Sequence, residues 1–159
     1  MKPGVHVETT IVSYLVARPS REPFLLGCQR LTRRWWRERR REYELFTSDT
    51  VIAEAGRGEA QMIRKRVRLL KNLGHLAATD EITALAEQLL VRGIVPRKAE
   101  GDAMHIAFAA SYGLEYLLTW NCTHLANPHV QARVARVVVE AGFDMPAIVT
   151  PMQLYPLSP

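Results

Sequence analysis

Residues 98–121 read Lys-Ala-Glu-Gly-Asp-Ala-Met-His-Ile-Ala-Phe-Ala-Ala-Ser-Tyr-Gly-Leu-Glu-Tyr-Leu-Leu-Thr-Trp-Asn, and this stretch decides the fold. Its first half repeats small and apolar residues three and four positions apart, which is the spacing of a helix packed closely on a flat surface. These residues are Ala103, Ile106, Ala107 and Ala110. Asp102 lies in the predicted first turn, and Gly113 follows as a helix cap. Residues 116–120 are too uniformly apolar for a strand with one solvent-exposed face. They therefore predict a strand buried on both faces that leads to Asn121.

The rest of the chain alternates in the same way between short β-like runs and longer amphipathic ones. We predict further strands at residues 5–7, 45–47, 75–78 and 147–149. Between them we predict a compact run at residues 11–16 and helices that start at Pro23, Thr50, Glu59, after Thr79 and after Asn127. Gly74, Gly93 and Gly142 are the expected stops of the last three.

Alternating strands and helices predict an α/β protein, a three-layer α/β/α arrangement around a five-stranded parallel sheet with right-handed crossovers. The 159 residues fit a single domain spanning positions 1–159. We expect no signal peptide, because residues 1–4 run directly into the first predicted strand, and no membrane span, because no apolar stretch approaches the ~20 residues required. Cys28 and Cys122 match no zinc or dithiol spacing, so we expect two buried thiols in a cytoplasmic protein.

The formal net charge of +5 favours an anionic partner such as nucleic acid, although many soluble domains carry a similar charge for solubility alone. The densest basic cluster surrounds Trp35 and Trp36 and includes Arg33, Arg34 and Arg37. Arginines bind phosphates and aromatic rings stack on bases, so this cluster is a candidate surface for RNA or a protein partner. The alternative is an ordinary solvated helix face.

Four polar residues are predicted at the carboxyl ends of the strands, where ligands gather in parallel sheets. Glu8 follows the first strand, Glu54 lies in the helix after the second, Asp102 begins the central helix and Asn121 follows the fourth strand. Carboxylates in one cleft repel one another unless a cation shares the site, and hard oxygen ligands favour Mg²⁺ or Mn²⁺. Such an ion activates water for phosphodiester hydrolysis.

Each acid also has an individual explanation, as a loop charge, an exposed helical charge or a complement to the helix dipole. The position they share favours the joint interpretation. His105 lies one turn beyond Asp102, and the sequence leaves open whether it faces the cleft or packs in the interior.

Three segments carry a resemblance to a known family. They are Val7-Glu8-Thr9-Thr10-Ile11-Val12-Ser13-Tyr14-Leu15, Ser48-Asp49-Thr50-Val51-Ile52-Ala53-Glu54, and Gly101-Asp102-Ala103-Met104-His105-Ile106-Ala107 with Leu117-Leu118-Thr119-Trp120-Asn121. Over nearly its whole length the chain resembles PIN domains, most closely the VapC-like toxins of bacterial and archaeal toxin–antitoxin pairs.

The resemblance implies a PIN-like fold and a Mg²⁺- or Mn²⁺-dependent ribonuclease that acts on RNA, forms a homodimer and is inhibited by a cognate antitoxin. The family's four polar positions correspond to Glu8, Glu54, Asp102 and Asn121. The first is more commonly Asp and the fourth is often Asp. With three negative charges at most, we do not expect tight binding of two ions.

Two rival hypotheses remain. In the first, the chain is a catalytically inactive module with the same fold that binds RNA or a protein through its basic surface. In the second it is a phosphoacceptor receiver domain. That chemistry needs an acidic pair and a basic residue around an aspartate at a strand end, whereas the only acid at the end of the first strand is Glu8.

Overall fold

The computed structural model describes residues 1–155 of the chain, so residues 156–159 of the predicted domain lie outside the described part. The elements are β1 (Gly4–Val7), α1 (Thr9–Val16), α2 (Pro23–Glu38), η1 (Arg40–Glu42), β2 (Glu44–Ser48), α3 (Asp49–Ala55), α4 (Ala60–Leu70), β3 (Gly74–Leu76), α5 (Asp80–Val91), η2 (Arg97–Ala99), α6 (Glu100–Ser111), β4 (Tyr116–Leu118), α7 (Pro128–Glu140) and β5 (Ala147–Val149). None of the helices in residues 1–155 combines the length and the apolar character that a membrane span requires.

The five strands form one sheet in the order β3-β2-β1-β4-β5, and every pair is parallel. This confirms the predicted five-stranded parallel sheet. Winding proceeds from β1 outward to β2 and β3, then returns to the other side of β1 for β4 and β5. The direction therefore reverses between β1 and β4, and a crevice for ligands opens at such a switch point, outside the carboxyl ends of the strands.

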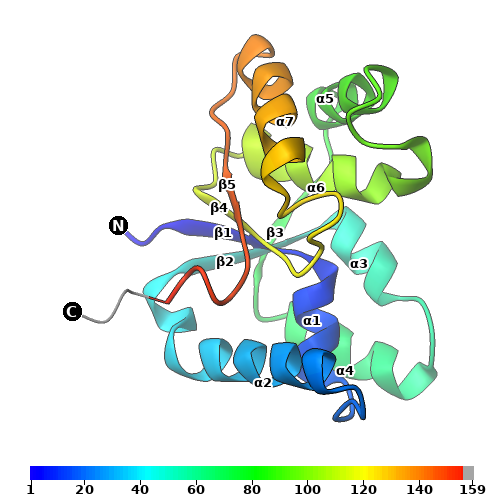
Figure 1. Cartoon of the computed structure of the whole chain (residues 1–159), viewed down its shortest axis with the longest axis vertical. Coiled ribbons are helices and arrows are strands. Elements are labelled where there is room, and N and C mark those ends of the chain that lie inside the picture. The colour runs from blue at the N-terminus through cyan, green and yellow to red at the C-terminus, as the bar shows by residue number, and fades with distance from the viewer. Residues whose placement is uncertain (156–159) are drawn as a thin grey trace.

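Two apolar clusters separate the helices into layers on the two faces of the sheet. Val5 and Val7 of β1 pack with residues of α1, α2 and α3, whereas Leu117 of β4 packs with residues of α5, α6 and α7. Figure 1 shows α5, α6 and α7 on one side of the strands and α1, α2 and α4 on the other. The three-layer arrangement predicted from the alternating pattern is thus confirmed.

Local capping explains why the helices begin where they do. The Ser48 hydroxyl accepts the Val51 N–H at the start of α3, and Thr79 and Asn127 cap α5 and α7 in the same way. Gly93, Gly113 and Gly142 all have positive φ, as expected for residues that stop a helix.

Several predicted features differ in the structure. Helix α4 ends at Leu70, and Gly74, the predicted helix stop, is instead the first residue of β3. A Cβ at this position would lie 2.6 Å from the Phe46 ring, so the strand needs glycine here. Strand β3 stops at Leu76, since the Ala78 N–H donates to the Asp49 carboxylate instead of to a strand. Cys28 is buried as expected, but Cys122 is exposed.

Strand β4 ends at Leu118, two residues before the predicted end. The Thr119 N–H still donates to the Val149 carbonyl at 2.9 Å, but the Trp120 N–H turns to the Thr10 hydroxyl, also at 2.9 Å. The chain leaves the sheet here and carries Asn121 into the loop before α7.

Candidate active site

Glu8 is a buried carboxylate held at the end of β1, where it caps α1. Its Oε2 accepts hydrogen bonds from the Thr10 N–H at 3.0 Å, from the Thr10 hydroxyl and from the Thr119 hydroxyl at 2.8 Å. These donors fix the orientation of the carboxylate and all approach one oxygen. Among the described residues, Oε1 of Glu8 accepts no hydrogen bond, and it faces His105.

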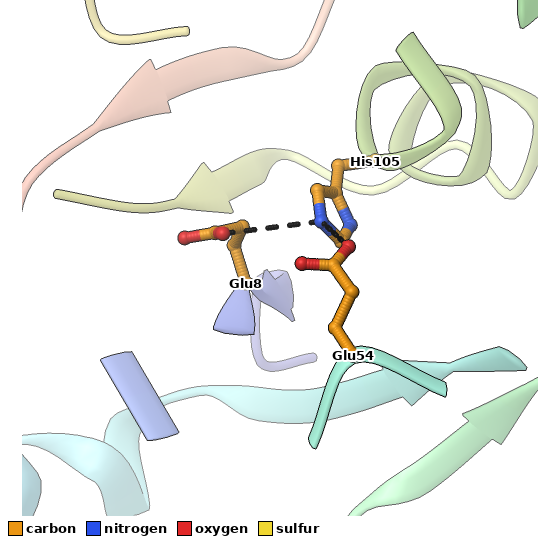
Figure 2. A group of neighbouring side chains, drawn as sticks. All are labelled: Glu8, Glu54 and His105. Atoms are coloured by element: carbon orange, nitrogen blue, oxygen red, sulfur yellow. Dashed lines mark ion pairs between the residues drawn. The ribbon is translucent and has the colours of Figure 1, made fainter. Parts of the chain in front are cut away.

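Glu54 of α3 and His105 of α6 complete a group of three side chains with Glu8 (Figure 2). The His105 Nε2 lies 2.8 Å from the Glu54 Oε1 and 3.9 Å from the Glu8 Oε1. The 2.8 Å contact between His105 and Glu54 is not aligned as a hydrogen bond. Within residues 1–155, the Glu54 Oε1 and both ring nitrogens of His105 therefore lack a well-aligned hydrogen-bond partner. One potential ligand atom from each of the three side chains lies within 4.8 Å of the other two.

The packing of α3 against α6 explains how Glu54 reaches this position. Gly101 and His105 are four residues apart on α6 and therefore share a face of the helix. A Cβ on Gly101 would lie 3.0 Å from the Glu54 Oε1, so glycine gives this carboxylate room beside the helix.

The three side chains influence one another's protonation. Complete burial of His105 disfavours its charged form, but the adjacent Glu54 carboxylate and the charges of Glu8 and Asp102 outweigh burial and raise the His105 pKa above its ordinary value. Partial burial likewise disfavours ionised Glu54, but the His105 ring and, further away, the Arg57 guanidinium lower the Glu54 pKa. Without a metal, the two glutamates therefore favour the charged form of His105.

Asp102 lies in the first turn of α6, as predicted, but its contacts differ from those of Glu8 and Glu54. Its Oδ2 accepts hydrogen bonds from the Asn121 side-chain amide at 3.1 Å and lies 3.0 Å from the His124 Nδ1. Within the described chain, its Oδ1 has no hydrogen-bond donor. One oxygen is thus fixed and the other is left for a ligand, as in Glu8.

Asn121 acts on the loop and on Asp102. Its Oδ1 accepts the backbone N–H groups of Thr123 at 3.2 Å and His124 at 3.0 Å, while its Nδ2 faces Asp102. Because the amide oxygen is already occupied, Asn121 is placed to orient Asp102 and His124.

The four residues predicted from the sequence therefore fall into two neighbouring groups. Glu8 and Glu54 meet at His105, whereas Asp102 and Asn121 meet at His124. A cleft of about 580 Å³ is lined by both Glu54 and Asp102, so it connects the two groups. Glu8 and His105 are almost fully buried and are absent from the lining of this cleft.

The two histidines are the residues that the sequence did not assign. The sequence features that could have pointed to them are spacings. His105 lies four residues after Gly101 on a helix of small residues, and His124 lies three residues after Asn121.

The arginines predicted to bind nucleic acid lie on α2 and have partners within the chain. Arg34 and Arg37 both contact Glu38 at 3.1 Å, and the Arg33 guanidinium donates to the Ala17 carbonyl. Helix α2 leads through η1 into the first residue of β2. Arg37, in the last turn of α2, therefore lies toward the amino ends of the strands, whereas Glu8 lies at their carboxyl ends.

The donor set fits a divalent cation. Carboxylate oxygens and an imidazole nitrogen are common metal ligands, and the unaligned Glu54 Oε1 and His105 Nε2 are buried polar atoms that an ion would satisfy. Carboxylates with an available second oxygen suit Mg²⁺ or Mn²⁺, which keep several waters when bound.

Of the comparisons with known proteins, the one with solved structures bears on the fold. No family model and no curated protein sequence matches the chain. Among solved structures, it is similar to Mycobacterium tuberculosis VapC20, described as a toxin that cleaves the sarcin-ricin loop, with a TM-score of 0.58 and 17% sequence identity. The match covers 76% of this chain and 92% of VapC20. The likeness confirms that the chain has the three-layer, PIN-like fold predicted from its sequence.

Proposed function

We propose that the protein is a metal-dependent endoribonuclease and the toxin component of a type II toxin–antitoxin pair. The observation that carries this proposal is the meeting of Glu8, Glu54 and His105 from three separate elements beside the cleft that contains Asp102. Burying two carboxylates together is costly unless a cation shares their site. The similarity to VapC20 supports RNA as the substrate.

Glu8, Glu54 and His105 would hold the ion, with Asp102 beside them on the cleft wall. When bound, Mg²⁺ or Mn²⁺ lowers the pKa of water and so supplies a nucleophile for attack on a phosphodiester. Thr10 and Thr119 keep Glu8 in one orientation through its Oε2.

On the cleft side, Asn121 and His124 hold Asp102 by its Oδ2. This contact leaves the Asp102 Oδ1 to orient the substrate or to accept a proton. Because Glu54 has 29% of its side chain exposed and Glu8 only 4%, substrate is expected to approach past Glu54.

Cleavage of labelled RNA by the purified protein tests the proposal. We expect cleavage with Mg²⁺ or Mn²⁺, none in EDTA, and a loss of cleavage by orders of magnitude in Glu54→Gln and Asp102→Asn. Glu87→Gln is the matched control, since Glu87 pairs with Arg97 on the surface. Isothermal calorimetry should show Mn²⁺ binding by the wild type and weaker binding by Glu54→Gln. Cleavage that survives EDTA and both site substitutions would rule out this mechanism.

We further propose a cognate antitoxin as partner, a homodimeric state, and action as a single domain in the cytoplasm. Co-expression with the product of an adjacent gene should abolish the ribonuclease activity, and light scattering should give twice the 18.0 kDa mass of the chain. A monomer at micromolar concentration would refute the dimer without affecting the proposed chemistry.

A further inference from the structure

The cleft beside the candidate active site has an unusual balance of charge for a surface that receives RNA. Four of its lining residues are acidic, namely Asp49, Glu54, Glu100 and Asp102. Two are basic, namely Arg57 and Lys98. An RNA backbone carries a negative charge at every phosphate, so the acidic lining repels it unless cations lie along its path.

Arg57 and Lys98 are free to act on a ligand. Both are exposed, and no salt bridge or side-chain hydrogen bond engages either of them in residues 1–155. Asp49, by contrast, is already engaged, because its two oxygens contact the His75 ring and the Ala78 N–H, each at 2.7 Å. Asp49 therefore does not need Arg57 or Lys98 as a partner.

Both cations lie close in the chain to Glu54 and Asp102, two of the four acids that line the cleft. Arg57 lies three residues after Glu54, and Lys98 lies four residues before Asp102. The loop that bears Arg57 is tied to α4, because the Arg66 guanidinium donates to the carbonyls of Ala55 and Arg57.

Lys98 sits in η2, a single turn that leads directly into α6. The Ala99 N–H closes this turn by donating to the Pro96 carbonyl at 2.8 Å. Arg57 lies two residues after the end of α3, and Lys98 lies two residues before the start of α6, so neither cation is on a long loop.

The cleft volume of about 580 Å³ lies within the ~300–1,000 Å³ range of ligand pockets. We propose that Arg57 and Lys98 form a phosphate-binding subsite that holds the RNA backbone in the cleft, next to the phosphodiester delivered to Glu54 and Asp102. This inference rests on the proposed ribonuclease function. It assigns substrate binding at the site to these two residues and not to the arginines of α2, which have partners within the chain.

Binding of a short fluorescent single-stranded RNA in EDTA tests the subsite without turnover. For single strands, the slope of log K against log[salt] changes by about 0.7 for each phosphate contact. Arg57→Ala and Lys98→Ala should therefore each reduce the slope by about 0.7, and the double variant by about 1.4. Arg57→Lys should restore most of the wild-type slope because it keeps the charge.

The matched controls are Arg34→Ala and Arg37→Ala, which remove exposed arginines from α2. They should leave the slope unchanged. In cleavage assays with Mn²⁺, the double variant should show a higher KM with little change in kcat, and circular dichroism should match the wild type.

The outcomes separate the two proposals. If the wild type cleaves RNA with metal but the double variant keeps the full slope, the subsite is refuted and the proposed function stands. If Arg34→Ala and Arg37→Ala reduce the slope instead, RNA binds on α2. If the wild type neither binds nor cleaves RNA, the proposed function itself fails.

Discussion

Replacing Thr119 by Val tests whether the hydrogen bonds donated to the buried Glu8 carboxylate stabilise the fold. Thr119 is fully buried, and its hydroxyl donates to the Glu8 Oε2 at 2.8 Å and accepts the Asn121 N–H at 2.9 Å. Valine keeps the shape of threonine and deletes the hydroxyl. A hydrogen bond to a charged group contributes about 1.5–3 kcal/mol, and the Asn121 N–H also loses its acceptor. We therefore expect the free energy of unfolding to fall by about 2–3 kcal/mol.

Thr47→Val is the matched control for this substitution. Thr47 is only 2% exposed, but its hydroxyl has no hydrogen-bond partner within residues 1–155. Removing an unpaired buried hydroxyl should leave stability unchanged or raise it by up to about 1 kcal/mol. The two variants thus delete the same atom in two buried settings that differ in hydrogen bonding.

Urea denaturation in EDTA, followed by circular dichroism, measures both effects without metal. In thermal melts the Thr119 variant should lose about 4–12 °C, given about 2–4 °C per kcal/mol for a chain of this size. Its affinity for Mn²⁺ should also fall, by about 10–100-fold, because Glu8 loses one of the donors that orient it. Equal stability changes in the two variants would refute the argument that Thr119 stabilises the fold through its hydrogen bond to Glu8.

Three further substitutions test the surroundings of the site. His124→Ala removes a contact to Asp102 and should slow cleavage by about 10–100-fold with stability nearly unchanged; a matching loss of stability would contradict a positioning role. Gly101→Ala should weaken Mn²⁺ binding in calorimetry, because its Cβ would crowd the Glu54 Oε1, and unchanged affinity would contradict the geometry. The Ala78 N–H and the His75 ring lower the Asp49 pKa, so the stability that Asp49 contributes is present above its unfolded pKa of about 4 and is lost as pH falls through the lower folded value. The difference in urea stability between wild type and Asp49→Asn should thus shrink from pH 6 to pH 3, whereas a constant difference would contradict it.

The alternation of apolar runs predicts the layers and the parallel sheet because each run needs a partner surface of a particular shape. The strand order could not be predicted in this way, because hydrophobic periodicity indicates which face of a strand is buried but not which other strand pairs with it. Gly74 shows the limit at single residues. As a residue after an apolar helix it predicts a cap, yet its place in β3 depends on the Phe46 ring from a neighbouring strand.

The candidate site divides in the same way. Glu8 can be predicted from the sequence because it directly follows a predicted strand. His105 becomes a candidate only in the folded structure, where α3 packs on α6 and Glu54 reaches the histidine. A lone histidine among small residues gives no sequence signal that separates a core position from a ligand. The Gly101–His105 spacing becomes informative once a side chain from another helix is known to lie against it.

The neutral residue at position 121 fits this geometry. Its Oδ1 is occupied by two N–H groups of its own loop, so the atom that faces the Asp102 Oδ2 at 3.1 Å must be a donor. An aspartate in the same orientation would place two carboxylate oxygens at that distance, which is unfavourable unless a cation lies between them. Asparagine avoids this repulsion and keeps Asp102 oriented without a second ion. The arrangement therefore favours a centre built for one cation at Glu8, Glu54 and His105, with Asp102 fixed by hydrogen bonds at the cleft.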